Sequence, residues 1–194
     1  MTYRKKLIEV SMPLEAINQE SAREKSIRHG HPSTLHLWWA RRPLAACRAV
    51  LFASLVDDPS AHPDKFTTEE EQQAERQRLH DLIGKIETIG NKQVVRGLVS
   101  WDDIKTDETG TSPIIEAAQK EIARCLAWDR GDEPPTEPEA VSKYLQEHAP
   151  PVYDPFCGGG SIPLEAQRLG IEAHGSDLNP VAVLITKALL RGRQ

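Results

Sequence analysis

The chain has few cysteines, few aromatic residues and no long hydrophobic run. Its three cysteines, Cys47, Cys125 and Cys157, lie far apart and form no Cys-x-x-Cys pair, which argues against a disulfide framework and a zinc knuckle. We therefore expect each to be a small core residue of a reduced, cytoplasmic protein. No apolar run approaches the roughly 18 residues that a membrane-spanning helix needs, and the N-terminus lacks the apolar core of a signal peptide. The sequence therefore predicts no membrane partner.

The rest of the composition is ordinary for a globular protein, with 39% hydrophobic and 27% charged residues, but the net charge of −5 is unevenly distributed. Residues 1–56 carry nine Lys or Arg against four Asp or Glu, whereas residues 57–150 carry eleven against twenty-one. A polyanion such as DNA would dock most readily on the basic N-terminal part. A solvated charged face explains the same counts equally well.

Composition and periodicity divide the chain into three regions, of which the first two are mainly helical. Residues 1–60 contain a strongly apolar helix at about 43–56, which we expect to be buried on nearly all sides. Residues 61–148 form an acidic insert. Its predicted helices cover about 67–87, about 113–128 and a short stretch ending near 148.

The third region, residues 149–194, alternates short strands with helices. The strands are predicted at about 151–154 and 171–176, and a helix follows each of them, at about 161–169 and 181–190. This order is typical of the start of a doubly wound α/β sheet, the fold in which a nucleoside cofactor sits at the strand ends.

Glycines crowd the turn after the first of these strands, where residues 154–161 read Asp-Pro-Phe-Cys-Gly-Gly-Gly-Ser. Glycines let the backbone turn sharply and touch a ligand, and the N–H groups that open the next helix favour an anionic group. The turn is not a P-loop, because no Gly-Lys-Ser/Thr follows. Pro163 stands where the dinucleotide fingerprint has Gly or Ala, which argues against NAD. A glycine-rich turn without a ligand is the alternative.

An acidic residue ends the second strand, 19 positions after Gly158. The carboxylate of Asp177 could accept both hydroxyls of a ribose, and Leu178 could lie on the adenine face. The alternative is that Asp177 caps the last helix, although Asn179 and Pro180 already suit the start of that helix.

Three segments together resemble a known family. The glycine turn resembles the Asp-Pro-Phe-x-Gly-x-Gly motif of amino-methyltransferases, which methylate exocyclic nitrogens of DNA bases, and residues 175–180 resemble their ribose-binding segment. Residues 4–58, above all the run His-Pro-Ser-Thr-Leu-His-Leu-Trp-Trp-Ala-Arg-Arg-Pro-Leu at 31–44, resemble the N-terminal module of prokaryotic adenine-specific DNA methylases, a domain of unknown function. The resemblance covers both ends of the chain.

The resemblance implies a fold, a cofactor and an activity. The fold would be α/β, a partial Rossmann-like S-adenosylmethionine-dependent methyltransferase fold with a large helical N-terminal and insert region, whose core begins at 149–194. The activity would be adenine-N6 methylation of DNA, with cytosine-N4 left open. The segment at 31–44 would contact the methionine end of S-adenosylmethionine. The implied cofactor-binding residues are Asp154, Pro155, Phe156, Cys157, Gly158, Gly159, Gly160, Asp177, Leu178, Ser33, Thr34 and Arg41.

Two adjacent tryptophans precede the apolar helix and have three interpretations. Trp38 and Trp39 could pack in the core, form a wall of the cofactor pocket or stack on a base.

The sequence lacks the Asp/Asn-Pro-Pro-Tyr/Phe motif that holds the target amine and stacks on the flipped base in such enzymes. We therefore assign no catalytic residue and no metal ligand, and expect an N-terminal fragment or one half of a split enzyme. DNA would bind through the basic N-terminal segment or through a partner chain. The partner would be a second polypeptide with the missing motif, or a second copy, because a two-stranded parallel sheet leaves an edge and a face uncovered. A non-catalytic cofactor-binding subunit of a restriction or phage-defence assembly, and an NAD-binding module, remain open.

Overall fold

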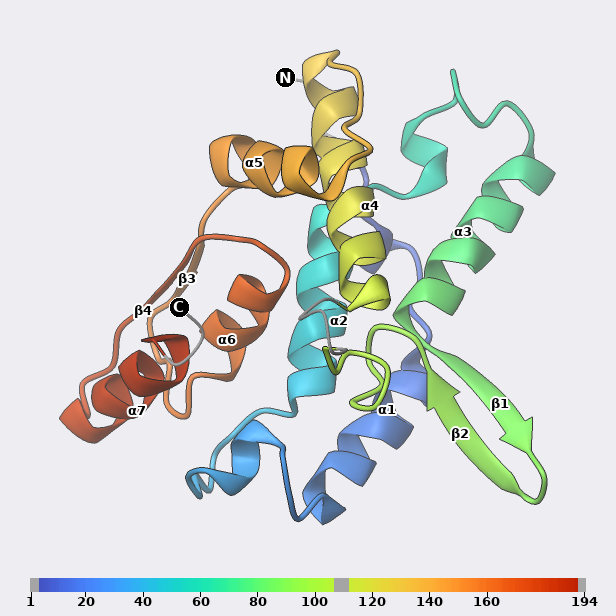
Figure 1. Ribbon diagram of the computed structural model, residues 1–194. Coiled ribbons are helices and arrows are strands. Elements are labelled where there is room, and N and C mark those ends of the chain that lie inside the picture. Colours follow the sequence, from blue (N-terminus) through green and yellow to red (C-terminus); the bar gives the residue numbers. More distant parts are fainter. Residues whose placement is uncertain (1–3, 107–111, 192–194) are drawn as a thin grey trace.

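The computed structural model describes residues 4–106 and 112–191. Over these residues the chain is a mixed α/β protein with seven α-helices and two separate two-stranded sheets (Figure 1). Four short 3-10 helices, Leu7–Glu9, Glu24–Ser26, Pro32–Thr34 and Pro59–Ala61, connect the N-terminal elements. In the part of the chain that the structure describes, no helix is long and apolar enough to cross a membrane.

Helix α2 (Leu44–Leu55) lies at the centre of the molecule and packs against α1 (Leu14–Arg23), α4 (Pro113–Arg130) and α6 (Ser161–Arg168) (Figure 1). The predicted apolar helix is thus confirmed, since Phe52 and its small neighbours are fully buried. One side of α2 is nevertheless open to solvent: Val50 and Ser54, one turn apart, are both exposed.

Helix α3 (Glu69–Ile83) begins with a capping box, in which the hydroxyl of Thr68 accepts a hydrogen bond from the Glu71 N–H. The predicted extension of this helix to about residue 87 was wrong. The chain instead forms an antiparallel hairpin of β1 (Lys85–Ile89) and β2 (Lys92–Arg96). The loop between the strands is Gly-Asn, a two-residue hairpin signal, with Gly90 at a φ of 63°.

Helix α4 ends at Gly131 in the left-handed conformation, as a helix C-terminus favours, and α5 (Pro138–His148) packs against α4. Both helices lie close to their predicted positions. The three cysteines are buried and free, as expected, and burial raises the pKa of Cys47 and of Cys125 to about 12.

The strand–helix–strand–helix order of the last region is confirmed. Strand β3 (Val152–Asp154) pairs in parallel with β4 (Ala173–Gly175), and α6 packs against both strands. Helix α7 (Pro180–Arg191) follows β4 and packs against α6 (Figure 1). The two strands are shorter than predicted, three residues each.

A buried ion pair joins α2 to α6. Arg48 Nη1 lies 2.6 Å from Glu165 Oε2, and both side chains are fully buried. The guanidinium also donates to two backbone carbonyls of the segment after β2, through Nε to Leu98 O at 2.5 Å and through Nη2 to Val99 O at 3.0 Å. One side chain therefore fixes three segments that are distant in the sequence.

We expect Arg48→Met to destabilise the protein by about 3–5 kcal/mol, because it removes the closer of the two cations that pair with the buried Glu165 carboxylate and leaves only Arg168, at 3.1 Å. The carbonyls of Leu98 and Val99 lose their donors as well. Equilibrium urea unfolding, followed by circular dichroism, measures the change.

Lys143→Ala is the matched control, since this lysine is exposed and lies 3.9 Å from its carboxylate partner Glu147. It should change the free energy of unfolding by less than about 0.5 kcal/mol. Equal effects of the two substitutions would contradict the assigned role of the buried pair.

Candidate functional site

The glycine turn and the predicted ribose-binding acid lie in direct contact. Gly158 N donates to Asp177 Oδ2 at 2.9 Å, which links the turn after β3 to the end of β4. The turn is held from the other side by Asp154, whose Oδ1 accepts a hydrogen bond from Phe156 N at 3.0 Å. The carboxyl ends of the two parallel strands therefore bring both motifs to one place.

Asp177 is ionised at neutral pH. Its other oxygen, Oδ1, accepts from Asn179 N at 2.9 Å, and the two backbone N–H groups of Asn179 and Gly158 lower the pKa of this carboxyl group. Each carboxylate oxygen has a second acceptor position, so both can still accept a ligand hydroxyl. The cap of α7 is Asn179, whose Oδ1 accepts from Val181 N at 3.0 Å.

A cavity of about 420 Å³ lies beside the glycine turn. Seven of the predicted site residues line it, namely Asp154, Phe156, Cys157, Gly158, Gly159, Asp177 and Arg41. The other lining residues are Trp38, Ala40, Arg42, Ser161 and Ile162. Five predicted residues do not line it, namely Pro155, Gly160, Leu178, Ser33 and Thr34. Two chain segments far apart in the sequence thus form opposite walls.

Trp38 covers the glycine turn. A Cβ added to Gly159 would lie 3.1 Å from Trp38 Cβ and 3.2 Å from Arg41 Cζ, so a larger residue would require these neighbours to shift by a few tenths of an ångström. Trp38 is half-buried and lines the cavity. Its interpretation as a wall of a cofactor pocket stays a prediction. Core packing was wrong for Trp39, which is 85% exposed and stacks on Trp38.

Arg41 brings unused hydrogen-bond donors to the same wall. Its Nη2 donates to His36 O at 3.1 Å, whereas Nε and Nη1 are buried and have no hydrogen-bond partner among the described residues. Burial lowers the pKa of this guanidinium, which nevertheless stays charged at neutral pH. An anionic ligand group would pair with these donors.

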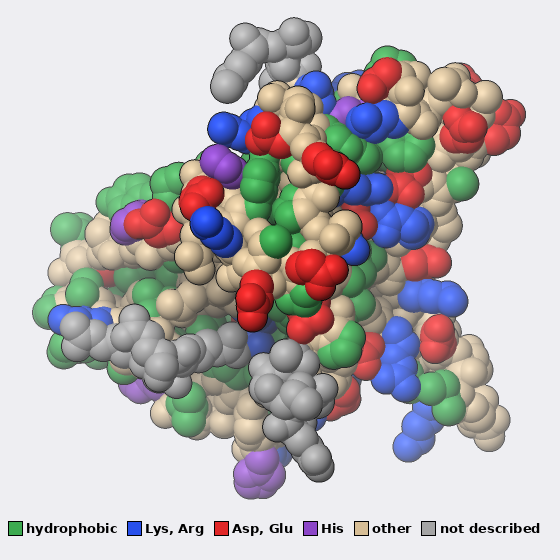
Figure 2. Space-filling view, turned by 45° about the horizontal axis from the view of Figure 1, so that its top comes forward, with side chains coloured by type: hydrophobic (Ala, Val, Ile, Leu, Met, Phe, Trp, Pro, Cys, Tyr) green, Lys and Arg blue, Asp and Glu red, His purple; other side chains and the backbone are tan. Residues whose placement is uncertain are grey.

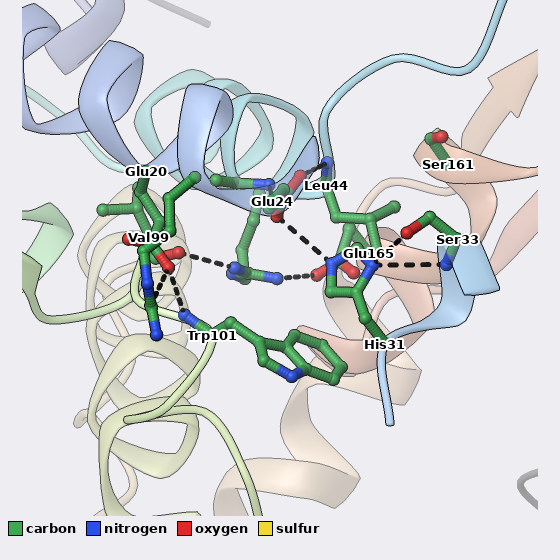
Figure 3. A network of polar contacts seen from close by, with 12 residues as sticks. Glu20, Glu24, His31, Ser33, Leu44, Val99, Trp101, Ser161 and Glu165 are labelled. Atoms are coloured by element: carbon green, nitrogen blue, oxygen red, sulfur yellow. Dashed lines mark hydrogen bonds and ion pairs between the residues drawn. The ribbon is translucent and has the colours of Figure 1, made fainter. Parts of the chain in front are cut away.

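Ser33 and Thr34 belong to a turn beside this cavity. Ser33 N donates to His31 Nδ1 at 3.2 Å (Figure 3). Thr34 Oγ1 donates to His31 O at 2.7 Å, so both residues hold the short helix Pro32–Thr34. Ser33 lines a second cavity of about 230 Å³, which shares Trp38, Arg41 and Arg42 with the first.

Glu24 is a residue whose role the sequence reasoning missed. Its carboxylate accepts hydrogen bonds from Leu44 N and Ala45 N, both at 2.8 Å, at the N-terminus of α2 (Figure 3). A negative charge is favourable there because the helix dipole leaves the N-terminus positive. Pro43 precedes α2 and offers no capping side chain, and that absence is the only sequence signal for a remote cap.

The described residues contain no group of three or more His, Cys, Asp and Glu that could hold a metal ion.

A family model described as a protein of unknown function (DUF1156) matches residues 11–82, well under half of the 194-residue chain. The match includes α1, α2 and α3, together with the Trp–Trp segment that covers the glycine turn. No curated protein matches the chain, and no solved structure matches it.

Gly160 tests how tightly the turn is packed. It has a φ of 73°, and an added Cβ would lie 2.9 Å from Thr186 Oγ1 in α7. We expect Gly160→Ala to destabilise the protein by about 1–3 kcal/mol, from the left-handed backbone and from the contact with α7. Thermal and urea unfolding measure the loss.

Gly131→Ala is the control for backbone strain. Gly131 has a φ of 76°, but an added Cβ there would have no neighbour within 4 Å. Gly131→Ala should therefore cost less than Gly160→Ala, and the difference reports the contact with α7. Equal losses would show that α7 does not pack on the turn as described.

Proposed function

We propose that this chain is the S-adenosylmethionine-binding part of a DNA amino-methyltransferase, with adenine-N6 as the preferred target on the sequence resemblance. The fold would then be the start of a Rossmann-like methyltransferase sheet. The observation that carries the proposal is the hydrogen bond from Gly158 N to Asp177 Oδ2, which puts the glycine turn and the acid on one cavity.

The residues of the cavity fit this cofactor. Asp177 offers carboxylate oxygens for the ribose hydroxyls, and Arg41 offers buried N–H donors for the carboxylate of the methionine moiety. The volume of about 420 Å³ lies within the range of small-molecule sites. S-adenosylmethionine would supply a methyl group on a sulfonium, which leaves the protein mainly to position the amine and to exclude water.

The target amine would be held by a partner. The sequence contains no Asp/Asn-Pro-Pro-Tyr/Phe motif, so we propose a second polypeptide that carries it, or a self-dimer. Large apolar side chains are exposed around β4 and α7, among them Leu178 at 96% and Leu184 at 66%. Figure 2 shows hydrophobic side chains on the side of the molecule that holds β3, β4 and α7. The missing motif equally fits a second candidate function, a cofactor-binding subunit without catalysis.

We expect S-adenosylmethionine to bind, and Asp177→Ala to weaken its affinity by more than about tenfold, because a charge-assisted hydrogen bond contributes about 1.5–3 kcal/mol. Isothermal titration calorimetry measures both affinities. Circular dichroism checks the fold, since the substitution also removes the acceptor of Gly158 N–H.

Asp64→Ala is the control, since this exposed carboxylate lies outside the cavity. NADH, titrated in the same way, tests the alternative nucleoside cofactor. Equal affinity of wild type and Asp177→Ala for S-adenosylmethionine would contradict the assignment of Asp177 to the ribose hydroxyls. Preferential binding of NADH would favour an NAD-binding module over the proposed function.

We expect the exposed apolar side chain of Leu184 to support association. Leu184→Glu should lower the average mass in multi-angle light scattering, or abolish co-purification of a chain with the missing motif, because burying an unpaired charge in an apolar interface is unfavourable.

Leu14→Glu provides a comparison, since Leu14 is exposed to a similar extent on α1, away from β4 and α7. A wild-type chain that is monomeric and acquires no partner would contradict the prediction. The same conclusion would follow if both substitutions weakened association equally.

A further inference from the structure

Trp39 presents an aromatic ring to solvent. It is 85% exposed, and its ring stacks on Trp38 with centroids 5.0 Å apart and planes 11° from parallel. Trp38 in turn packs on the glycine turn, where its Nε1 would lie 3.0 Å from a Cβ added to Gly158. One face of the exposed Trp39 ring is therefore packed on Trp38, which itself packs on the glycine turn, and the other face is open to solvent.

Cationic side chains line the same cavity as this ring. Both tryptophans line the cavity of about 230 Å³, together with Lys25, Arg41 and Arg42. Glu24 also lines it, but the Glu24 carboxylate is buried and accepts the N–H groups that open α2. The accessible charges of the cavity, Lys25 and Arg42, are positive.

This combination matches one class of ligand. Proteins bind an unpaired nucleobase by stacking it on an exposed aromatic ring. They bind the phosphates on either side of that base with Lys and Arg side chains. An apolar protein segment would bury the ring but would leave the cations without a counter-charge. The charge complementarity therefore selects nucleic acid as the occupant.

We infer that the outer face of Trp39 is a stacking platform for an unpaired base of DNA, with Lys25 and Arg42 at the adjacent phosphates. The inference rests on the proposed function, since a base methyltransferase must hold the strand that carries its target. It adds a specific contact, because neither the glycine turn nor Asp177 lines this cavity.

The platform would hold a base next to the target and not the target itself. Trp38 lies between Trp39 and the glycine turn, and it lines both cavities. A base stacked on Trp39 would thus be separated from the cofactor cavity by the ring of Trp38. The strand would pass over this wall, so that another base could reach the cofactor cavity.

The experiment measures binding of a short fluorescein-labelled single-stranded DNA to the full chain by fluorescence anisotropy. Trp39→Ala should weaken binding by about 5- to 150-fold, the range for loss of one base–aromatic stack, whereas Trp39→Phe should keep most of the affinity. Leu37→Ala is the matched control, since Leu37 is 87% exposed and lines the same cavity but has no π face. It should leave the affinity within about twofold of wild type.

A second probe separates stacking from charge. An oligonucleotide of abasic sites keeps the phosphates but offers no base to stack, so it should bind wild type more weakly than normal DNA and should bind Trp39→Ala and wild type equally. The inference is overturned if Trp39→Ala binds normal DNA as wild type does. It is also overturned if Leu37→Ala loses as much affinity, or if wild type binds the abasic probe as tightly as DNA.

Titration of S-adenosylmethionine into the same variants keeps the two proposals distinguishable. Trp39 does not line the cofactor cavity, so Trp39→Ala should bind this cofactor as wild type does. If wild type binds DNA through Trp39 but fails to bind S-adenosylmethionine, only the proposed function fails. If S-adenosylmethionine binds and the substitution leaves DNA affinity unchanged, only the platform fails.

Discussion

The buried ion pair of Arg48 and Glu165 is the interaction on which the arrangement of the site depends. It joins α2, in the segment matched by the family model, to α6, the helix that follows the glycine turn. Burying two opposite charges away from water is favourable only when both are well paired and hydrogen-bonded. Arg48 meets this condition because it also donates hydrogen bonds to the carbonyls of Leu98 and Val99. Arg168 of α6 also pairs with Glu165, at 3.1 Å, but it cannot join α6 to α2. The pair therefore favours one relative position of the two helices, because any other position would separate the buried Arg48 from the Glu165 carboxylate.

The walls of the cavity beside the glycine turn follow from this position. Once α2 and α6 are fixed, the segment before α2 must pass over the glycine turn, and the Ser161 hydroxyl holds it there by donating to Arg42 O at 2.9 Å. Glu24 fixes the N-terminus of α2 from the other side. Trp38 and Arg41 thus cover the turn because of backbone contacts at both ends of their segment. The cavity is consequently a property of two regions that are more than a hundred residues apart.

Local patterns explain what the sequence could predict, and long-range contacts explain what it could not. The alternation of strands with helices and the glycine turn located β3, β4 and the helices after them. Asp177 follows β4 by two residues, slightly beyond the predicted strand end, and contacts the glycine turn. The hairpin of β1 and β2 was missed because charged residues continue through it, although its Gly-Asn loop was readable. Arg48 stands out as the one charged residue of its apolar helix, but nothing local identifies Glu165 as its partner. Nothing local shows that Trp38 would be covered and Trp39 exposed. Those outcomes depend on which distant segment packs against each side chain.

The distribution of charge is also decided by the fold. The middle region has an excess of acidic residues, but many of its carboxylates form ion pairs. Asp58 accepts hydrogen bonds from Nε and Nη2 of Arg76, and Glu75 accepts hydrogen bonds from Arg78 and Arg124. Figure 2 shows acidic and basic side chains mixed over the side that carries α3 and α4. Paired charges at a surface produce little field beyond the Debye length of about 8 Å at physiological salt. The acidic region therefore repels a polyanion less than its composition suggests. On the proposed function, Lys25 and Arg42, which have no ion-pair partner among the described residues, would decide where a nucleic acid strand approaches, beside the cavity at the glycine turn.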